Sequence, residues 1–341
     1  MKRFLDLADF ERAEILDLLA LAQSLKDSPP GPVLAGKVLG LVFLNPSLRT
    51  LASFQTAMAR LGGAAFVITP GQGTWQLETR PHAVMDGAAA EHIREGIPVL
   101  ASYADALGLR AFADGKNLAD DLNESLFRTI DELCDAPLIN LESAVNHPCQ
   151  ALADWRTLDE LGVPERAKFV LSWAPHPRAL PLAVPAAVVH MAAMRGMEVV
   201  VARPEGFALP QAIMDKARAA AAASGGSLSE TADRAAALKG AHVLYAKEWG
   251  STAHYGDAQA DAQLRAGLKD WCVREQWFCA AAPGAAFMHC LPVRRNVAVA
   301  DEVLDGPRAA VKRAALNRLT VQTAVLYRML APTHQAAENH R

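Results

Sequence analysis

Hydrophobic residues in the first half of the chain form one helical pattern, followed by short apolar blocks. Residues 10–26 carry apolar side chains at helical spacing and end before the breaker run DSPPGP, which predicts an amphipathic helix. Helical segments, among them residues 120–134, alternate with short β-rich runs at residues 37–45, 64–69, 107–113 and 137–142. This alternation predicts βαβ units and a parallel sheet.

A second series of the same kind begins near His147. The segments HPCQALADWRTLDELG and DKARAAAAASGG predict helices, and glycine ends the second of them. Apolar runs predict further strands at residues 167–173, 197–203, 241–247 and 285–291. A last helical pattern, residues 313–331, places on one side Leu316, Leu319, Val321 and Val325.

The pattern as a whole predicts an α/β fold with two doubly wound parallel-sheet domains joined near residues 143–150. We expect the first domain to span residues 1–146 and the second residues 147–310. Residues 311–341 are expected to form a closing helix. A chain of 341 residues is long enough for two domains of ordinary size, each with an ample core.

Composition and charge disfavour several classes of protein. Hydrophobic residues make up 51% of the chain and the formal net charge is −3, as is typical of globular proteins. No block rich in lysine or arginine is present, so we expect no nucleic-acid partner. Charges interrupt the apolar residues of positions 1–23, which argues against a signal peptide or a membrane span. Five scattered cysteines without paired spacing predict reduced thiols and a cytoplasmic location.

The segment FLNPSLRTLASF, residues 43–54, places polar side chains where a predicted strand gives way to a helix. In parallel sheets, ligands bind beyond the carboxyl ends of the strands, where helix N-termini offer free N–H groups to anions. Ser47 and Thr50 add hydroxyl donors, and Arg49 adds a planar guanidinium suited to phosphate. The alternative is a serine N-cap beside a solvated arginine, and this segment alone does not decide. The glycine pattern of a dinucleotide fingerprint or a P-loop is absent.

Two further segments present polar side chains next to predicted strands. The segment NHPCQ puts His147 and Gln150 three residues apart, hence on one face of a helix, and Arg110 follows a strand in LGLRAF. Together they are placed to polarise a carbonyl oxygen as it becomes an oxyanion. In FMHCLPVRRN, a strand leads through Cys290 to a proline turn and two arginines. The alternative there is a buried small thiol and a basic loop.

The tetrapeptides SLRT, HPCQ and HCLP, in this order and at these separations, resemble the aspartate/ornithine carbamoyltransferase superfamily. Each tetrapeptide is weak alone, but the ordered triple extends over most of the chain. The resemblance implies that the phosphate of carbamoyl phosphate is held by Ser47, the Leu48 main chain, Arg49 and Trp75. One departure is Leu51, because the family often carries a second arginine at this position.

The resemblance implies a second set of residues around the carbamoyl group. The carbonyl oxygen would be held, as it gains charge, by Thr50, Arg110 and His147. The NH2 group would be held by Gln150, the main chain at Cys290 and Leu291, and Arg318. Cys290 would also lie beside the attacking nitrogen. No metal or organic cofactor is expected, because phosphate departure and charge stabilisation suffice.

At the level of the fold, the resemblance implies an N-terminal carbamoyl phosphate domain and a C-terminal domain for the amine substrate. The final helix would cross back to the first domain. A homotrimer with active sites between subunits is also implied, in which Trp75 on GQGTWQLE reaches a neighbour's site. An exposed tryptophan on a glycine-rich loop otherwise costs hydrophobic free energy.

The segment YAKEWGS bears on the amine substrate. Ornithine transcarbamylases carry an aspartate two residues before a tryptophan, followed by Ser-Met-Gly, whereas this chain has Lys247 there and no Ser-Met-Gly. A lysine repels an ammonium but accommodates a carboxylate, or an α-nitrogen made neutral by acylation; the alternative is a solvated loop lysine. The segments QGTWQLE, VMDG, WAPHPRALPLAVP and FMHCLPVRRN resemble N-acylornithine transcarbamylases. The resemblance implies that the acylated amino acid is bound by Glu142, His176, Lys247 and Arg294.

Within that branch, one position bears on the acyl group. Acetyl enzymes carry a glutamate three residues after MDG, which blocks a longer, charged acyl tail, and succinyl enzymes carry proline there. This chain has Ala90, which removes both the bulk and the charge. A lysine that acetyl enzymes can carry after RRNV is here Ala298. The resemblance therefore favours N-succinylornithine in arginine biosynthesis, with N-acetylornithine as the alternative.

Two other functions remain open from the sequence. An oxidoreductase with a Rossmann-like second domain is disfavoured, because no GxGxxG pattern follows AKFVLSW. The second is a catalytically silent homologue used for binding or assembly. Leu51 keeps that possibility open, but it is disfavoured by the presence of Arg49, Thr50, Arg110, His147, Gln150 and Cys290.

Overall fold

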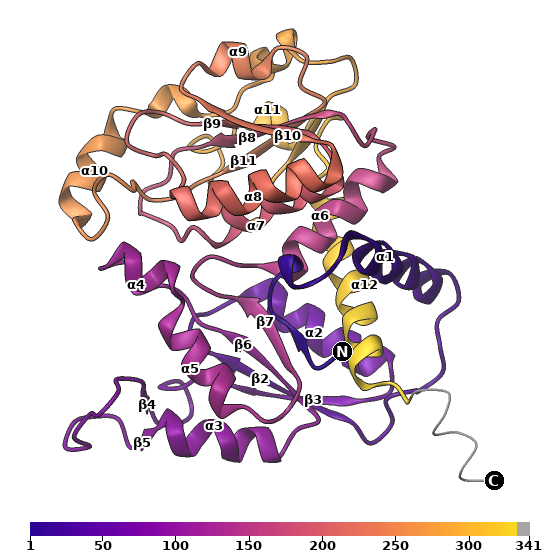
Figure 1. Ribbon diagram of the computed structural model, residues 1–341, viewed down its shortest axis with the longest axis vertical. Coiled ribbons are helices and arrows are strands. Elements are labelled where there is room, and N and C mark those ends of the chain that lie inside the picture. Colours follow the sequence, from indigo (N-terminus) through magenta and orange to yellow (C-terminus); the bar gives the residue numbers. More distant parts are fainter. Residues whose placement is uncertain (333–341) are drawn as a thin grey trace.

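The computed structural model describes residues 1–332, which form two domains, each built on a parallel sheet (Figure 1). The first sheet has the strand order β1-β7-β6-β2-β3, and the second has the order β10-β9-β8-β11-β12. Adjacent strands are parallel throughout both sheets. The predicted α/β fold with two parallel-sheet domains is therefore confirmed. The predicted domain boundaries stay predictions.

The first domain contains all four strands predicted for it. Its sheet consists of β1 (Arg3–Phe4), β2 (Val38–Phe43), β3 (Ala64–Ile68), β6 (Ala106–Arg110) and β7 (Leu138–Glu142). Its helices are α1 (Arg12–Asp27), α2 (Leu48–Arg60), α3 (Ile93–Ser102), α4 (Leu118–Leu122) and α5 (Ser125–Leu133). The strand β1 was not predicted, because two residues are too few to show a period.

The single helix predicted for residues 120–134 is wrong. The structure divides this segment into α4 and α5 at Glu124, whose φ of 52° lies in the left-handed region. The Glu124 carboxylate accepts a hydrogen bond from the Val145 amide at 3.1 Å. This contact ties the break to the segment between β7 and α6 (Pro148–Glu160), which leads into the second domain.

The second domain repeats the alternation of strands and helices. Its sheet consists of β8 (Lys168–Trp173), β9 (Glu198–Ala202), β10 (Ser227–Thr231), β11 (Val243–Lys247) and β12 (Ala286–Met288). Its helices are α7 (Ala183–Arg195), α8 (Gln211–Ser224), α9 (Arg234–Leu238), α10 (Ala258–Ala266) and α11 (Asp301–Leu304). The edge strand β10 was missed because its sequence, SLSET, is mostly polar. The helix α8 ends, as predicted, at a glycine: Gly225 has a φ of 72°.

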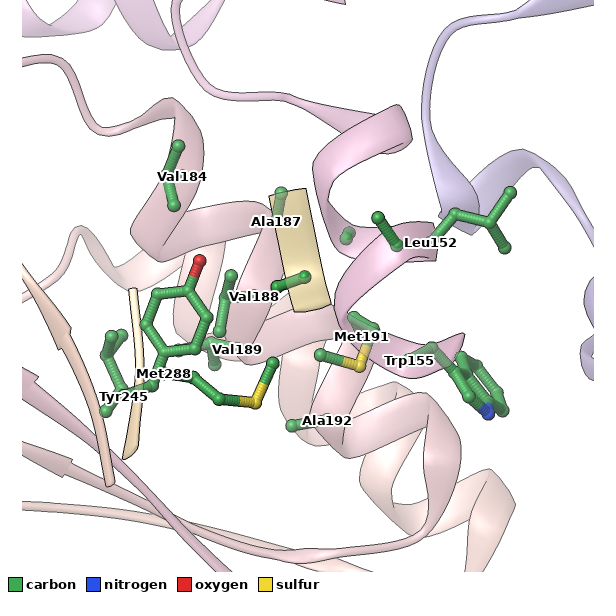
Figure 2. Packing of buried hydrophobic residues seen from close by; sticks show 14 of the residues in the cluster. Leu152, Trp155, Val184, Ala187, Val188, Val189, Met191, Ala192, Tyr245 and Met288 are labelled. Atoms are coloured by element: carbon green, nitrogen blue, oxygen red, sulfur yellow. The ribbon is translucent and has the colours of Figure 1, made fainter. Parts of the chain in front are cut away.

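The core of the second domain is built around α7, all of whose residues are buried. Figure 2 shows valines and Met191 of this helix among Leu152 and Trp155 of α6, with Tyr245 and Met288 of the sheet close by. Tyr245 and Met288 are direct partners in the register of β11 and β12. The helix α6 is therefore fixed to the second sheet through α7.

The last helix, α12 (Val311–Leu330), packs against α1, α2 and α6 and so returns to the first domain (Figure 1). The prediction of which residues form the apolar side of α12 is partly wrong. Val321 and Val325 are fully buried, but Leu316 is 70% exposed. The buried side instead includes the polar residues Asn317 and Arg318. Residues 333–341 of the predicted closing segment lie outside the described residues.

Polar contacts also join the two domains. The Tyr255 hydroxyl donates a hydrogen bond to Asp121 on α4 at 2.7 Å, and Lys216 on α8 forms an ion pair with Asp6. All five cysteines are free. Within residues 1–332, no helix combines the length and apolar character needed to cross a membrane.

Candidate active site

A cavity of about 630 Å³ lies where the carboxyl ends of strands from both sheets meet. The segments that follow β2, β6, β7, β8, β11 and β12 contribute to its walls, together with α12. Thirteen of the predicted site residues line it: Ser47, Leu48, Arg49, Arg110, Glu142, His147, Gln150, His176, Lys247, Cys290, Leu291, Arg294 and Arg318. This is the region in which ligands of parallel α/β sheets bind.

The start of α2 forms one wall of the cavity. Ser47 is the N-cap of this helix, and its hydroxyl accepts a hydrogen bond from the Thr50 amide at 3.3 Å. The cap and the anion site therefore do not exclude each other, because the helix N-terminus remains at the cavity. Arg318 donates from Nη2 to the buried Thr50 hydroxyl at 2.6 Å, which joins α12 to this wall. The Nε of Arg49 is buried without a protein partner.

Arg110, Glu142 and His147 form a second group, at the ends of β6 and β7 and the start of α6. One Glu142 oxygen pairs with Nη1 of Arg110 and lies 3.4 Å from Nε2 of His147. Burial lowers the pKa of His147 well below its usual value, and neighbouring arginines lower it further. The imidazole is therefore neutral near pH 7, and its contact with Glu142 is not an ion pair.

Gln150 lies one turn into α6, beside two buried polar residues that the sequence did not single out. Its Nε2 donates to Asp154 at 2.9 Å, and the Tyr245 hydroxyl donates to the other Asp154 oxygen at 3.0 Å. The Gln150 Oε1 is buried and has no protein partner. The Asp154 side chain lies four residues after Gln150, a helical spacing that could have drawn attention to it.

Lys247, at the end of β11, is only 7% exposed, so a solvated loop lysine does not describe it. Its ammonium donates to the main-chain oxygen of Glu248 at 2.9 Å and to the Glu248 carboxylate at 3.1 Å. Burial lowers the pKa of Lys247, but Glu248 together with Cys290 and Glu142 more than offsets burial, so the pKa is raised overall. His289 contacts the same carboxylate at 3.3 Å. The cavity therefore presents a charged lysine here.

The loop after β8 supplies His176, which lies 3.4 Å from Nε of Arg294. Arg178 also lines the cavity and was missed, although the string APHPRALP contained it. Arg295, the second arginine of the basic loop, instead pairs with Asp301 and Asp305. Only the first arginine of that loop lines the cavity.

The cavity is strongly cationic. Among its lining residues, all of which fall within residues 1–332, Glu142 is the sole carboxylate. Six lining residues carry positive charge: Arg49, Arg110, Arg178, Lys247, Arg294 and Arg318. A cavity of this kind attracts anions, and a ligand with several negative charges fits it best.

Two family models match this chain. The carbamoyl-P binding domain of aspartate/ornithine carbamoyltransferase matches residues 2–160, and the Asp/Orn binding domain of the same family matches residues 184–329. The chain belongs to the aspartate/ornithine carbamoyltransferase family. The protein is thus a carbamoyltransferase, and the expectation of an enzyme is confirmed.

Curated relatives cover nearly the whole of this carbamoyltransferase. The N-acetylornithine carbamoyltransferase of Xanthomonas campestris is 38% identical over 330 residues, which are 96% of this chain and 97% of the relative. The N-succinylornithine carbamoyltransferase of Bacteroides fragilis is 37% identical over 294 residues, 86% of this chain and 87% of the relative. The ornithine carbamoyltransferase of Methanoculleus marisnigri is 32% identical, over 97% of each chain.

Solved structures agree with the fold of this carbamoyltransferase. An acetylornithine transcarbamylase complexed with acetylcitrulline has a TM-score of 0.93 at 36% identity, covering 97% of this chain and all of the other. An N-acetyl-L-ornithine transcarbamylase variant with a glutamate replaced by alanine, complexed with carbamyl phosphate and N-succinyl-L-norvaline, has a TM-score of 0.92. That variant is 37% identical and covers 96% of this chain and all of its own.

Three predicted site residues of this carbamoyltransferase are not among those that line the cavity of their own chain. Thr50 is fully buried, and its hydroxyl accepts a hydrogen bond from Arg318. Trp75 and Ala90 belong to the exposed segment around β4 (Leu77–Glu78) and β5 (Glu91–His92), which projects beside α3 (Figure 1). Trp75 is 61% exposed, and its indole donates to Glu91 at 2.7 Å. The predicted reach of Trp75 into a neighbouring subunit's site, and the predicted effect of Ala90 on the acyl group, stay predictions.

Proposed function

We propose that this carbamoyltransferase transfers the carbamoyl group of carbamoyl phosphate to the δ-amine of N-succinyl-L-ornithine in arginine biosynthesis. The products are N-succinyl-L-citrulline and phosphate. The observation that carries the proposal is the charge of the cavity, which is lined by six cationic residues and one carboxylate. Carbamoyl phosphate is a dianion, and N-succinylornithine carries two carboxylates beside a single ammonium. Free ornithine carries two ammonium groups and is the least favourable of these ligands for a positively charged cavity.

The phosphate end of the substrate is assigned to the start of α2. The N-terminal amides of this helix, the Ser47 hydroxyl and the Arg49 guanidinium offer donors to phosphate oxygens. The free Nε of Arg49 supports this assignment, because a buried donor without a partner is costly unless a ligand satisfies it. Trp75 of a second subunit is assigned to the same phosphate, which requires the proposed homotrimer.

In the proposed reaction, the neutral δ-amine attacks the carbonyl carbon and a C–N bond forms. The carbonyl oxygen becomes an oxyanion, held by Thr50, Arg110 and the neutral His147. The bond to the bridging oxygen then breaks, and phosphate leaves with the amine proton. Neutral His147 donates a hydrogen bond without itself requiring a counter-ion, and such preorganised donors typically lower the barrier by ~3–4 kcal/mol each.

The NH2 group is assigned to Gln150, Arg318 and the main chain at Cys290 and Leu291. Burial of the Cys290 thiol raises its pKa to about 11, so the thiol stays protonated near pH 7. Cys290 is therefore assigned to contact with the attacking nitrogen rather than to covalent catalysis.

The acylated amino acid is assigned to the opposite wall of the cavity. His176, Lys247 and Arg294 offer donors to its carboxylates, and Glu142 offers an acceptor to its amine before deprotonation. Lys247 remains charged in the presence of Glu248, so a second ammonium beside it is disfavoured by like-charge repulsion.

We assign succinyl rather than acetyl as the acyl group of the substrate because of Ala90. A related acetyl enzyme with a glutamate replaced by alanine has been crystallised with N-succinyl-L-norvaline, and the proline variant has been as well. By resemblance, that glutamate corresponds to Ala90, where this chain already lacks both bulk and charge. The second candidate is N-acetylornithine, which is favoured by the similarity to the Xanthomonas enzyme.

A competition assay tests the assignment. We expect a higher kcat/KM for N-succinylornithine than for N-acetylornithine, and we expect Ala90→Glu to reverse the order. A close like-charge pair at an effective dielectric near 20 costs roughly 4 kcal/mol, or about three orders of magnitude in kcat/KM. Ala88→Glu places the same charge two residues earlier on the exposed segment and should leave the order unchanged. A wild-type preference for the acetyl substrate would contradict the assignment.

A further inference from the structure

Asp154 is a fully buried carboxyl group four residues after the cavity-lining Gln150 on α6. Burying a carboxylate without a paired cation costs several kcal/mol. Arg318 lies near enough to influence Asp154, but its Nη2 donates to Thr50 instead. The Asp154 carboxyl is satisfied by two neutral donors, the Gln150 amide and the Tyr245 hydroxyl. Stability alone therefore gives little reason for a carboxyl group here.

The contact with Asp154 determines which way the Gln150 amide faces. Asp154 accepts from the Gln150 amide in the structure, so the amide turns its NH2 group, not its oxygen, towards Asp154. The distance from Nε2 to the nearer Asp154 oxygen is 2.9 Å. The other end of the amide, Oε1, is consequently left as a free acceptor, and Gln150 lines the cavity. Without a fixed partner, the two orientations of an amide are almost equivalent in shape.

Tyr245 holds Asp154 from the opposite side. Its hydroxyl donates to the second Asp154 oxygen at 3.0 Å, and its ring packs in the apolar core. Figure 2 shows this hydroxyl directed away from Met288, towards the end of α7 that carries Val184. Both oxygens of the carboxyl group are thus occupied, and its rotation would break both hydrogen bonds.

We propose that Asp154 is a positioning residue that fixes the Gln150 oxygen towards the NH2 group of carbamoyl phosphate. The enzyme thereby selects a carbamoyl group over an acyl group that carries a methyl in place of NH2. This inference rests on the proposed function, because it takes Gln150 as the residue that faces the NH2 group. Asp154 itself does not touch the substrate.

Two stable analogues test the selection directly. Phosphonoacetamide carries the CONH2 group, and acetonylphosphonate differs from it by a methyl in place of NH2. Calorimetric titration of both, and of inorganic phosphate, gives a preference ratio for each variant. We expect the wild type to prefer phosphonoacetamide. We expect Asp154→Leu to lower this preference by ~10- to 100-fold, the range for an unsatisfied or misdirected buried hydrogen bond, while phosphate binding changes little.

Two matched variants separate positioning from packing. Asp154→Asn keeps an acceptor that can face Gln150 and should restore most of the preference. Tyr245→Phe leaves the contact with Gln150 intact and should retain it as well. If the leucine side chain does not fit at position 154 and the variant fails to fold, Asp154→Ala removes the carboxyl group without adding volume. Circular dichroism verifies the fold of each variant. A variant that weakens both analogues equally, with the ratio unchanged, would show that Asp154 serves packing only and would overturn the proposal.

Gln150→Ala distinguishes this inference from the assignment beneath it. Loss of the preference in Gln150→Ala but not in Asp154→Leu or Asp154→Ala would refute the positioning role alone. Retention of the preference in Gln150→Ala would refute the assignment of Gln150, and the inference with it. The absence of turnover with any acylornithine in the wild type would instead contradict the proposed function, independently of the analogue ratio.

Discussion

Removal of the negative charge from Glu142 is expected to have opposite effects on the two substrates. Glu142→Gln keeps the shape of the side chain, which contacts Arg110 and lies 3.4 Å from His147. Two unit charges 4 Å apart interact by about 4 kcal/mol at an effective dielectric of 20, before desolvation and screening are considered. We expect about a third of this interaction energy to appear as tighter binding of the anionic analogue, because neighbouring cations and water weaken the effect of the Glu142 charge. That fraction corresponds to an approximately tenfold tighter binding of phosphonoacetamide.

The amine substrate should respond in the other direction. Among the cavity-lining residues within positions 1–332, Glu142 is the one negatively charged acceptor. Glu142→Gln should therefore lower kcat/KM for the acylornithine by ~100-fold, as expected for a charged hydrogen bond. Calorimetry measures the first effect and steady-state phosphate release measures the second. Glu142→Asp retains the charge and serves as the control, with no tightening expected. Weaker analogue binding in Glu142→Gln, or an unchanged kcat/KM, would refute the electrostatic reasoning.

Three further predictions concern catalysis, specificity and stability. Arg49→Ala and His147→Ala should each lower turnover by ~10²- to 10³-fold with an unchanged circular dichroism spectrum, and near-normal turnover would contradict their roles. Free ornithine should form citrulline poorly, because its α-ammonium would face Lys247, and efficient citrulline formation in a colorimetric assay would be incompatible with this. Burial raises the pKa of Asp154 from 3.8 to about 7, so its contribution to stability is full below pH 3.8 and is lost as pH rises through about 7. Asp154→Asn should therefore stabilise the protein more at pH 8 than at pH 5. Only the interval from pH 5 to about 7 contributes to this difference, which is at most about 3 kcal/mol of unfolding free energy. Calorimetry showing an equal effect at both pH values would exclude this linkage.

The parts of the fold that follow local periodicity could be predicted from the sequence. Buried strands and their following helices leave a strong apolar signal, and so the junction at Ser47 and the start of α6 were located correctly. The edge strand β10 and the break at Glu124 leave no such signal, because one is polar and the other depends on a single left-handed residue. Leu316 fits a helical stripe by spacing, but α12 turns polar residues inwards instead.

The candidate site shows the same division. The residues after predicted strands could be anticipated because the carboxyl ends of parallel strands gather at one edge. The contact between Asp154 and Tyr245 could not be anticipated, because only the tertiary packing brings together these residues, which are 91 positions apart in the sequence. Arg178 lies in the segment WAPHPRALPLAVP, but no sequence pattern distinguishes it from a surface residue. The role proposed for Trp75 depends on a second subunit, which a single chain does not contain.

The excess of positive charge around the cavity also has a kinetic consequence. The attraction that speeds the arrival of a phosphate-bearing substrate acts equally on the phosphate that remains after transfer. At the proposed phosphate site, the phosphate would keep its contacts with the start of α2 after the carbamoyl group has left, and it would have to escape from the same positive field. Departure of phosphate is therefore expected to be slower than the chemical step, so that added salt slows substrate capture but quickens turnover at saturation.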